Sequence, residues 1–144
     1  MFKRILTVCV GNICRSPTAE YLFRQQLGAS DVHLSSAGLG AMVGHPIDPM
    51  AQQLLAEHGV DGQAHRARQL TAAMLREADL VLGMEGSHVA AITRFAPEAS
   101  GKVFVLDRWL QSRDIPDPYR QSRDAFEHVY GMIAQGVDSW MRFL

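Results

Sequence analysis

The fold is decided by the stretch Ile5-Leu6-Thr7-Val8-Cys9-Val10-Gly11-Asn12-Ile13-Cys14-Arg15-Ser16-Pro17. The apolar run that ends at Cys9 predicts a buried strand, and the pattern that begins at Pro17 predicts a helix. Ser16 is a residue type favoured at a helix N-cap, and Pro17 is one favoured at the first helical position. Residues 9–15 are therefore expected to form a tight loop between a strand and a helix N-terminus.

This loop has the features of a site for a phosphate-sized anion. Backbone N–H groups at a helix start lack intrahelical acceptors and lie in the positive field of the helix dipole. Gly11 and Asn12 tolerate the positive φ angles that let such groups converge on one point. Arg15 adds a planar fork of donors that suits phosphate oxygens. We expect phosphate to be bound by Val10, Gly11, Asn12, Ile13, Cys14, Arg15 and Ser16.

Cys9 is predicted to be a nucleophile. So much positive potential favours its thiolate form near neutral pH, and a thiolate beside a bound phosphoryl group is set for in-line attack and a covalent phospho-cysteine. A lone cysteine after a core strand is more often buried and inert, but the whole stretch favours the nucleophile. The loop lacks the Gly-Lys-Ser/Thr ending of a nucleotide-binding loop, and the cysteines lack zinc-ligand spacing, so we expect no metal and no cofactor.

Length and composition indicate an ordinary globular protein. The chain has 144 residues, 47% hydrophobic and 20% charged, which suits a single domain spanning residues 1–144. A net charge of −1 gives no sign of nucleic-acid binding. The first apolar run is too short for a signal peptide or a membrane span, so no direct membrane insertion is expected. A reactive cysteine favours a reducing compartment, hence the cytoplasm.

Strand and helix patterns alternate along the chain. We expect four strands at residues 3–8, 32–37, 80–84 and 103–106, and helices at 17–27, 49–58, 72–77, 87–95 and from 123 onward. This alternation predicts an α/β fold of three layers, in which helices cover both faces of a four-stranded parallel sheet. Right-handed crossovers give a doubly wound, flavodoxin-like topology with strand order 2-1-3-4. Ligands of such folds bind at the carboxyl ends of the strands, where the Cys9 loop lies.

The second half of the chain offers candidates for the remaining chemistry. Expulsion of a leaving oxygen requires a proton donor, and Asp117, held between two prolines, is the best candidate, with Asp114 as the alternative. On residue types alone, a surface turn explains Asp117 better than catalysis does. Tyr119 is a candidate for an aromatic wall of the site, and Leu39 and Met42 are candidates for the opposite wall.

His65 and Cys14 have weaker signals. His65 could hydrogen-bond to the phosphate loop, although a surface or core role is the commoner fate of a lone histidine. Cys14 could form a disulfide with Cys9 under oxidation and so protect the nucleophile, or it could simply pack in the loop.

Taken together, the sequence resembles the low-molecular-weight protein tyrosine phosphatases over nearly its whole length. The resemblance depends on four motifs, Val8 to Pro17 as quoted above, Ser36-Ala37-Gly38, His65-x-Ala67-Arg68 and Asp117-Pro118-Tyr119. It implies that Cys9 is the nucleophile, Arg15 binds phosphate, and Asp117 is general acid and then general base. It also implies that the hydroxyl after the arginine assists departure of the thiolate. The loop-supporting residues that it implies are Asn12, Ser16, Ser36 and His65.

The sequence is most similar to the bacterial branch that dephosphorylates tyrosine autokinases of capsule and exopolysaccharide export. This resemblance implies metal-independent hydrolysis of protein phosphotyrosine, with the cytoplasmic tail of a membrane autokinase as partner. Two alternatives stay open. An arsenate reductase can share the scaffold, but it needs further thiols, and none follows Cys14. A non-enzymatic module that binds phosphoproteins would have no use for a positioned Asp117.

Overall fold

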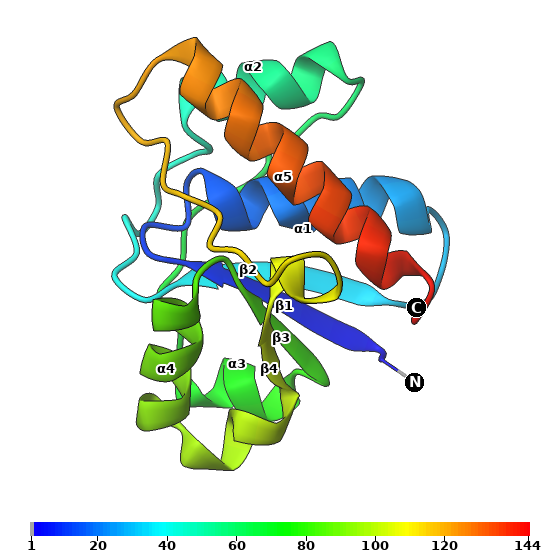
Figure 1. Cartoon of the computed structure of the whole chain (residues 1–144), viewed down its shortest axis with the longest axis vertical. Helices are drawn as coiled ribbons and strands as arrows, with labels where there is room; N and C mark the ends of the chain where they lie inside the picture. The colour runs from blue at the N-terminus through cyan, green and yellow to red at the C-terminus, as the bar shows by residue number, and fades with distance from the viewer. Residues whose placement is uncertain (1) are drawn as a thin grey trace.

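Four parallel strands form one sheet in the order β2-β1-β3-β4 (Figure 1). This computed structural model describes residues 2–144. The strands are β1 (Arg4–Cys9), β2 (His33–Gly38), β3 (Leu80–Gly83) and β4 (Val103–Val105). The central strand β1 pairs with β2 and β3, so that Val8 lies between Ala37 and Gly83. The predicted strand order and parallel sheet are confirmed.

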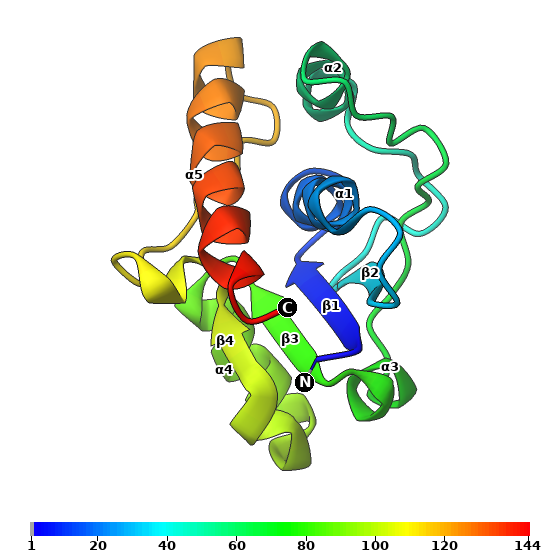
Figure 2. The same ribbon diagram turned by 90° about the vertical axis from the view of Figure 1, so that its right-hand side faces the viewer.

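Helices cover both faces of this sheet, as the alternating pattern predicts. Figure 2 shows α1, α2 and α5 on one face and α3 and α4 on the other. The helices are α1 (Arg15–Leu27), α2 (Pro49–Glu57), α3 (Ala72–Glu77), α4 (Gly86–Phe95) and α5 (Arg123–Met141). Within residues 2–144, every helix is too short or too polar to span a bilayer.

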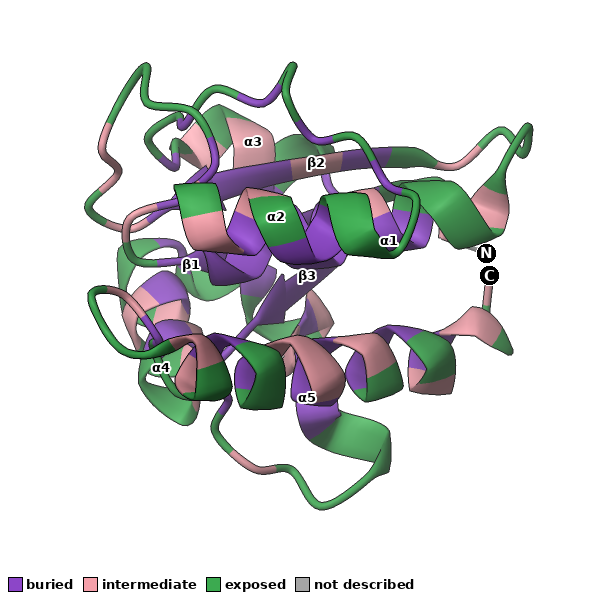
Figure 3. Ribbon diagram, turned by 90° about the horizontal axis from the view of Figure 1, so that it is seen from above, coloured by how far each residue is buried: buried purple, intermediate pink, exposed green. Residues whose placement is uncertain are grey.

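The two faces of the sheet bury separate apolar clusters, and the strands are largely buried (Figure 3). Successive side chains of a strand point to opposite faces. Ile5 and Cys9 therefore belong to the larger cluster beneath α1, α2 and α5, whereas Leu6 and Val8 belong to the smaller one beneath α3 and α4. This alternation directs the sulfur of Cys9 toward the layer that contains α1.

Most of the predicted helix starts are confirmed by side-chain caps. Asp48, Thr71 and Ser122 each accept hydrogen bonds from backbone N–H groups in the first turn of α2, α3 and α5. The prediction for α1 is wrong, because the helix begins at Arg15 and its N-cap residue, Cys14, forms no side-chain cap. Two short 3-10 helices that the sequence did not indicate flank β4, η1 (Pro97–Lys102) and η2 (Leu106–Trp109).

Candidate active site

The loop between β1 and α1 turns at Asn12. This residue has a φ of 59°, in the left-handed region that asparagine tolerates better than most residues. Gly11 does not adopt a positive φ, so that part of the prediction is wrong. The loop lies at the carboxyl edge of the sheet, where the fold predicts a ligand site.

The carbonyl oxygens of the loop are held from outside by other segments. Residues 38–48, here called the belt, run beside the loop and donate most of these hydrogen bonds. The four hydrogen bonds from the belt run from Leu39 N to Cys9 O (2.9 Å), Gly40 N to Val10 O (3.0 Å), Met42 N to Gly11 O (3.0 Å) and Asp48 N to Ile13 O (2.8 Å). His65 Nε2 lies 2.7 Å from Asn12 O and must be protonated there, because a carbonyl only accepts.

With its carbonyls bonded outward, the loop keeps its N–H groups free. Within residues 2–144, no backbone carbonyl or side chain accepts from the N–H groups of residues 10–15, whereas Ser16 N lies 3.4 Å from Cys9 Sγ. Buried N–H groups without an acceptor are rare in folded proteins. A set of them on one short loop is therefore a strong indication of an oxyanion site.

A buried polar network holds the hydroxyl of Ser16 beside the sulfur of Cys9. Asn12 Nδ2 donates to Ser16 Oγ (2.8 Å) and to Ser36 Oγ (3.0 Å), and Arg68 N fixes this orientation by donating to Asn12 Oδ1. Ser16 Oγ, which accepts from Asn12, lies 2.9 Å from Cys9 Sγ and can direct its own proton to the sulfur. Both the hydroxyl and the backbone N–H of Ser16 (3.4 Å) therefore face the sulfur.

The hydroxyl of Ser36 continues this network. It donates to Glu20 Oε1 (2.7 Å), and Glu20 is also paired with Arg24. Ser36 and Glu20 are 3% and 5% exposed, so their hydrogen bonds are shielded from water. The structure thus brings all four predicted loop-supporting residues into contact with the loop or with one another.

Arg15 is 2% exposed and is held by one edge of its guanidinium group. Nη1 donates to the carboxylate of Glu85 and to the carbonyl oxygen of Ile115 (2.9 Å). Nη2 lies 3.8 Å from Asp117 Oδ2. Nε has no hydrogen-bond partner within residues 2–144. Burial of an unpaired guanidinium N–H is costly, so this edge is suited to an anionic ligand.

These groups surround a cavity of about 210 Å³. It is lined by Cys9, Val10, Gly11, Ile13, Cys14, Arg15, Gly40, Met42, Asp117 and Tyr119. Asp117 is half exposed at the cavity, and its Oδ1 accepts from Tyr119 N at 3.0 Å. Leu39 does not line the cavity, because its side chain packs against the smaller core cluster. Gly40 lies at the cavity in its place.

The second cysteine is chemically different from the first. Cys14 is 5% exposed, and burial raises the pKa of its thiol well above the ordinary value, with Asp48 adding to the effect. It therefore stays protonated at neutral pH and is a poor nucleophile.

His88, on the first turn of α4, is also buried. Its Nδ1 accepts from the backbone N–H groups of Met84 and Glu85, both at 3.2 Å. Burial lowers the pKa of His88, and the positive charge of Arg15 lowers it further. His88 is thus a neutral side chain that caps the backbone N–H groups of Met84 and Glu85.

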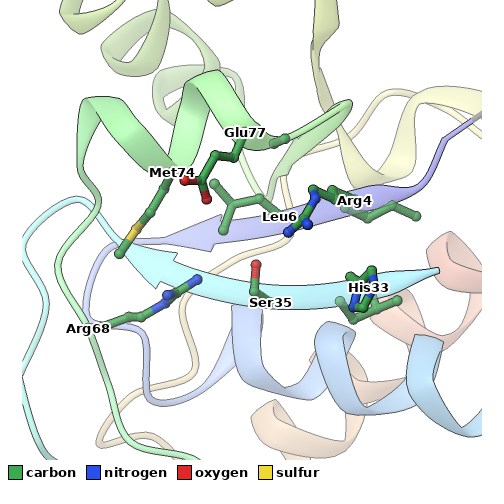
Figure 4. A pocket seen from close by; sticks show the side chains of 10 residues that line it. Arg4, Leu6, His33, Ser35, Arg68, Met74 and Glu77 are labelled. Carbon is green, nitrogen blue, oxygen red and sulfur yellow. The ribbon is translucent and has the colours of Figure 1, made fainter. Parts of the chain in front are cut away.

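A second hollow lies between β2 and α3, away from Cys9. Figure 4 shows Arg4, Ser35, Arg68 and Glu77 around it. Its lining has no cysteine, so we place the active site at Cys9. Within residues 2–144, no three histidine, cysteine, aspartate or glutamate side chains come together as a metal site would require.

A model of the low molecular weight phosphotyrosine protein phosphatase family matches residues 4–144. The chain belongs to this family. It is 48% identical to the low molecular weight protein-tyrosine-phosphatase Etp of Escherichia coli over 143 residues, 99% of this chain and 95% of Etp. The prediction of a protein-tyrosine phosphatase with bacterial relatives is confirmed.

Solved structures agree with the fold. The structure of Vibrio vulnificus Wzb in complex with benzylphosphonate has a TM-score of 0.95 and 42% identity, and the match covers all of both chains. A more distant phosphatase of the same fold is the YwlE arginine phosphatase, solved as a cysteine-to-serine mutant with a phosphorylated active-site serine. It has a TM-score of 0.90 and 29% identity, with 98% of this chain and 95% of YwlE covered.

Two residues of this phosphatase site were missed in the sequence. Glu85 lies two residues after the end of the buried strand β3, at the carboxyl edge where ligands of doubly wound folds bind, and that position was the available signal. Glu20 is a charged residue one turn after Ser16, on the inward face of an apolar helix pattern. A buried charge needs a partner, so its position could have indicated a polar network.

Proposed function

We propose that this phosphatase hydrolyses protein phosphotyrosine through a phospho-cysteine formed on Cys9. The observation that carries the proposal is the combination of a hydrogen-bonded sulfur with unpaired donors around it, namely the N–H groups of residues 10–15 and Arg15 Nε. A phosphate held by those donors has its phosphorus above Cys9 Sγ. Benzylphosphonate, the ligand of the Vibrio vulnificus relative, has a phosphonate joined to a benzyl group, which is similar to the end of phosphotyrosine.

In the first step, Cys9 Sγ attacks phosphorus and the bond from phosphorus to the tyrosyl oxygen breaks. Asp117 gives its proton to that oxygen, which leaves as the neutral phenol. The loop amides and Arg15 stabilise the charge on the equatorial oxygens, a contribution for which loss of one donor costs on the order of 10²-fold in rate. The hydrogen bond from Ser16 stabilises the sulfur as a leaving group for the second step.

In the second step, water attacks phosphorus and the S–P bond breaks. Asp117, now ionised, takes the proton of that water, so that the thiolate, inorganic phosphate and protonated Asp117 are restored. The YwlE relative supports covalent catalysis, because phosphate is attached to the active-site serine of its cysteine-to-serine mutant.

The proposed substrate and location are those implied by the resemblance to bacterial exopolysaccharide phosphatases. We propose the phosphorylated cytoplasmic tail of a bacterial tyrosine autokinase that controls exopolysaccharide export as the partner. The site then acts in the cytoplasm, as one domain comprising the whole chain. Tyr119, Gly40 and Met42, which line the cavity, provide the walls for the phosphotyrosine ring.

Arsenate reduction is not favoured. With Cys9 as the attacking sulfur, Cys14 is the only other cysteine in the sequence. Burial raises the pKa of its thiol, which therefore stays protonated at neutral pH. A binding module is not favoured either, because the chain belongs to a family of phosphatases.

The test is phosphate release from a phosphotyrosyl peptide with EDTA present, for the wild type, Cys9→Ser and Cys14→Ser. We expect Cys9→Ser to lose at least about 10⁴-fold in kcat, because removal of a nucleophile has effects of that order or larger. Cys14→Ser, which changes the other thiol of the loop but keeps its backbone amide, is expected to lose far less activity than Cys9→Ser. Full turnover by Cys9→Ser would contradict the mechanism, and faster release from a phosphoarginyl peptide would contradict the substrate.

A further inference from the structure

The segment that carries Asp117 is fastened to the start of α4 by two hydrogen bonds that run in opposite directions. Ile115 N donates to Met84 O at 2.9 Å, and Gly86 N donates to Asp114 Oδ1 at 2.8 Å. We call this pair of hydrogen bonds the clasp. The carbonyl oxygen of Ile115 in turn accepts from Arg15, so the clasp adjoins the phosphate site.

Asp117 has few restraints of its own. It belongs to the irregular segment between η2 and α5, with no regular pairing to hold its backbone. Its side chain is half exposed, lies 3.8 Å from Arg15 and accepts only from Tyr119 N, while its backbone carbonyl accepts from Gln121 Nε2. Apart from the contact of its side chain with Arg15, the nearest long-range contacts that restrain the backbone of the general acid are those of the clasp, two and three residues upstream.

We propose that Asp114 is a positioning residue that holds Asp117 at the cavity by accepting the N–H of Gly86. This inference rests on the proposed function, in which Asp117 protonates the leaving oxygen. Asp114 does not line the cavity, and its Oδ1 is bonded to the first N–H of α4, a position where helix termini favour a carboxylate. Asp114 therefore acts through Asp117 and does not replace it.

Each side of the Asp114–Gly86 hydrogen bond can be removed separately. Asp114→Ala removes the acceptor, whereas Asp114→Asn keeps an amide oxygen there and removes only the charge. Gly86→Pro removes the donor and its Cδ displaces the Asp114 carboxylate, but it does not break the helix, since proline is favoured at a first helical position. Glu85, with φ −135° and ψ 157°, already has the extended conformation that a residue before proline requires.

The readout is kcat/KM for a series of aryl phosphates whose phenols differ in acidity. An acidic phenol leaves without help, whereas a weakly acidic phenol needs the proton from Asp117. With weakly acidic phenols we expect Asp114→Ala and Gly86→Pro to lose about five- to tenfold, the effect of one net hydrogen bond. With the most acidic phenol they lose less than about twofold, and Asp114→Asn stays close to the wild type in the whole series. The double variant Asp114→Ala/Gly86→Pro is no worse than either single variant, because both remove the same contact.

Asp31→Ala is the matched surface control, an exposed aspartate paired with Lys3 at the amino end of the sheet. Equal losses across all phenols, or a loss in Asp114→Asn as large as in Asp114→Ala, would overturn the positioning role. Failure of the proposed function would give different results. The kcat/KM of Asp117→Asn would then not depend on the acidity of the phenol, or Cys9→Ser would keep its activity.

Discussion

Gly38 provides a direct test of how the belt sets the shape of the phosphate loop. It ends β2 and lies against the loop backbone, so that a Cβ at this position would be 2.4 Å from Val10 O and 3.1 Å from two atoms of Ala41. Gly40, two residues further along the same belt, has room for a methyl group, because its Cβ would be 3.9 Å from Val10 Cγ1. Gly38→Ala and Gly40→Ala are thus the same substitution with and without a backbone collision.

The size of the effect follows from the distance. Carbon atoms approach carbonyl oxygens to roughly 3.3 Å, so Gly38→Ala must move Val10 O or β2 by roughly 0.9 Å. The carbonyl of Val10 accepts from Gly40 N in the belt, and the amide of Val10 is one of those that we propose bind phosphate. A misplacement of this size costs on the order of 10²-fold in rate. Overpacking should also lower the free energy of unfolding by about 1–3 kcal/mol.

The assay is kcat/KM with an aryl phosphate, together with inhibition by inorganic phosphate and urea unfolding of each variant. We expect Gly38→Ala to lose about 10²-fold in kcat/KM and to bind phosphate more weakly while still folded. Gly40→Ala should stay within about threefold of the wild type, since its methyl group meets only ordinary contacts. The reasoning is refuted if folded Gly38→Ala keeps wild-type kinetics, or if Gly40→Ala is impaired equally.

Two further predictions concern stability and are tested by urea unfolding. In α5, a Cβ at Gly136 would lie 2.7 Å from Leu106 Cγ, whereas a Cβ at Gly131 would have no neighbouring atom within 4 Å. Gly136→Ala should therefore destabilise by about 1–2 kcal/mol after the gain in helix propensity, and Gly131→Ala should stabilise by about 0.5–1 kcal/mol. Equal effects would contradict this packing. Because the pKa of His88 is lowered from 6.5, the unfolded chain takes up that proton first. The free energy of unfolding should fall as pH drops below 6.5, and less steeply in His88→Asn. Parallel pH profiles would exclude His88 as the cause.

Local signals made the fold and the centre of the site predictable. Apolar runs and caps such as Asp48 and Ser122 are set by neighbouring residues, so their elements could be placed from the sequence. The loop from Cys9 to Arg15 is continuous in sequence, and its position after the first strand follows from the fold class.

The errors arose where a distant contact decides what a residue does. Ser16 has the residue type of an N-cap, but its hydroxyl is bonded to Cys9 and Asn12, and only the folded chain shows this. Leu39 is adjacent to the cavity in sequence, yet its side chain packs into the smaller core. Glu85 pairs with Arg15 across 70 residues of sequence, and although its position after β3 indicates the site, nothing in the sequence indicates that these two residues pair.

The central claim is that the loop amides and Arg15 hold the phosphoryl group against the sulfur of Cys9. A crystal structure of the protein grown with vanadate tests it most directly. We predict vanadium bonded to Cys9 Sγ, with its equatorial oxygens on the N–H groups of residues 10–15 and on Arg15 Nε, and one apical oxygen facing Asp117. Vanadate bound elsewhere, for example beside Arg4 and Arg68 in the hollow between β2 and α3, with the Cys9 loop empty, would contradict the account.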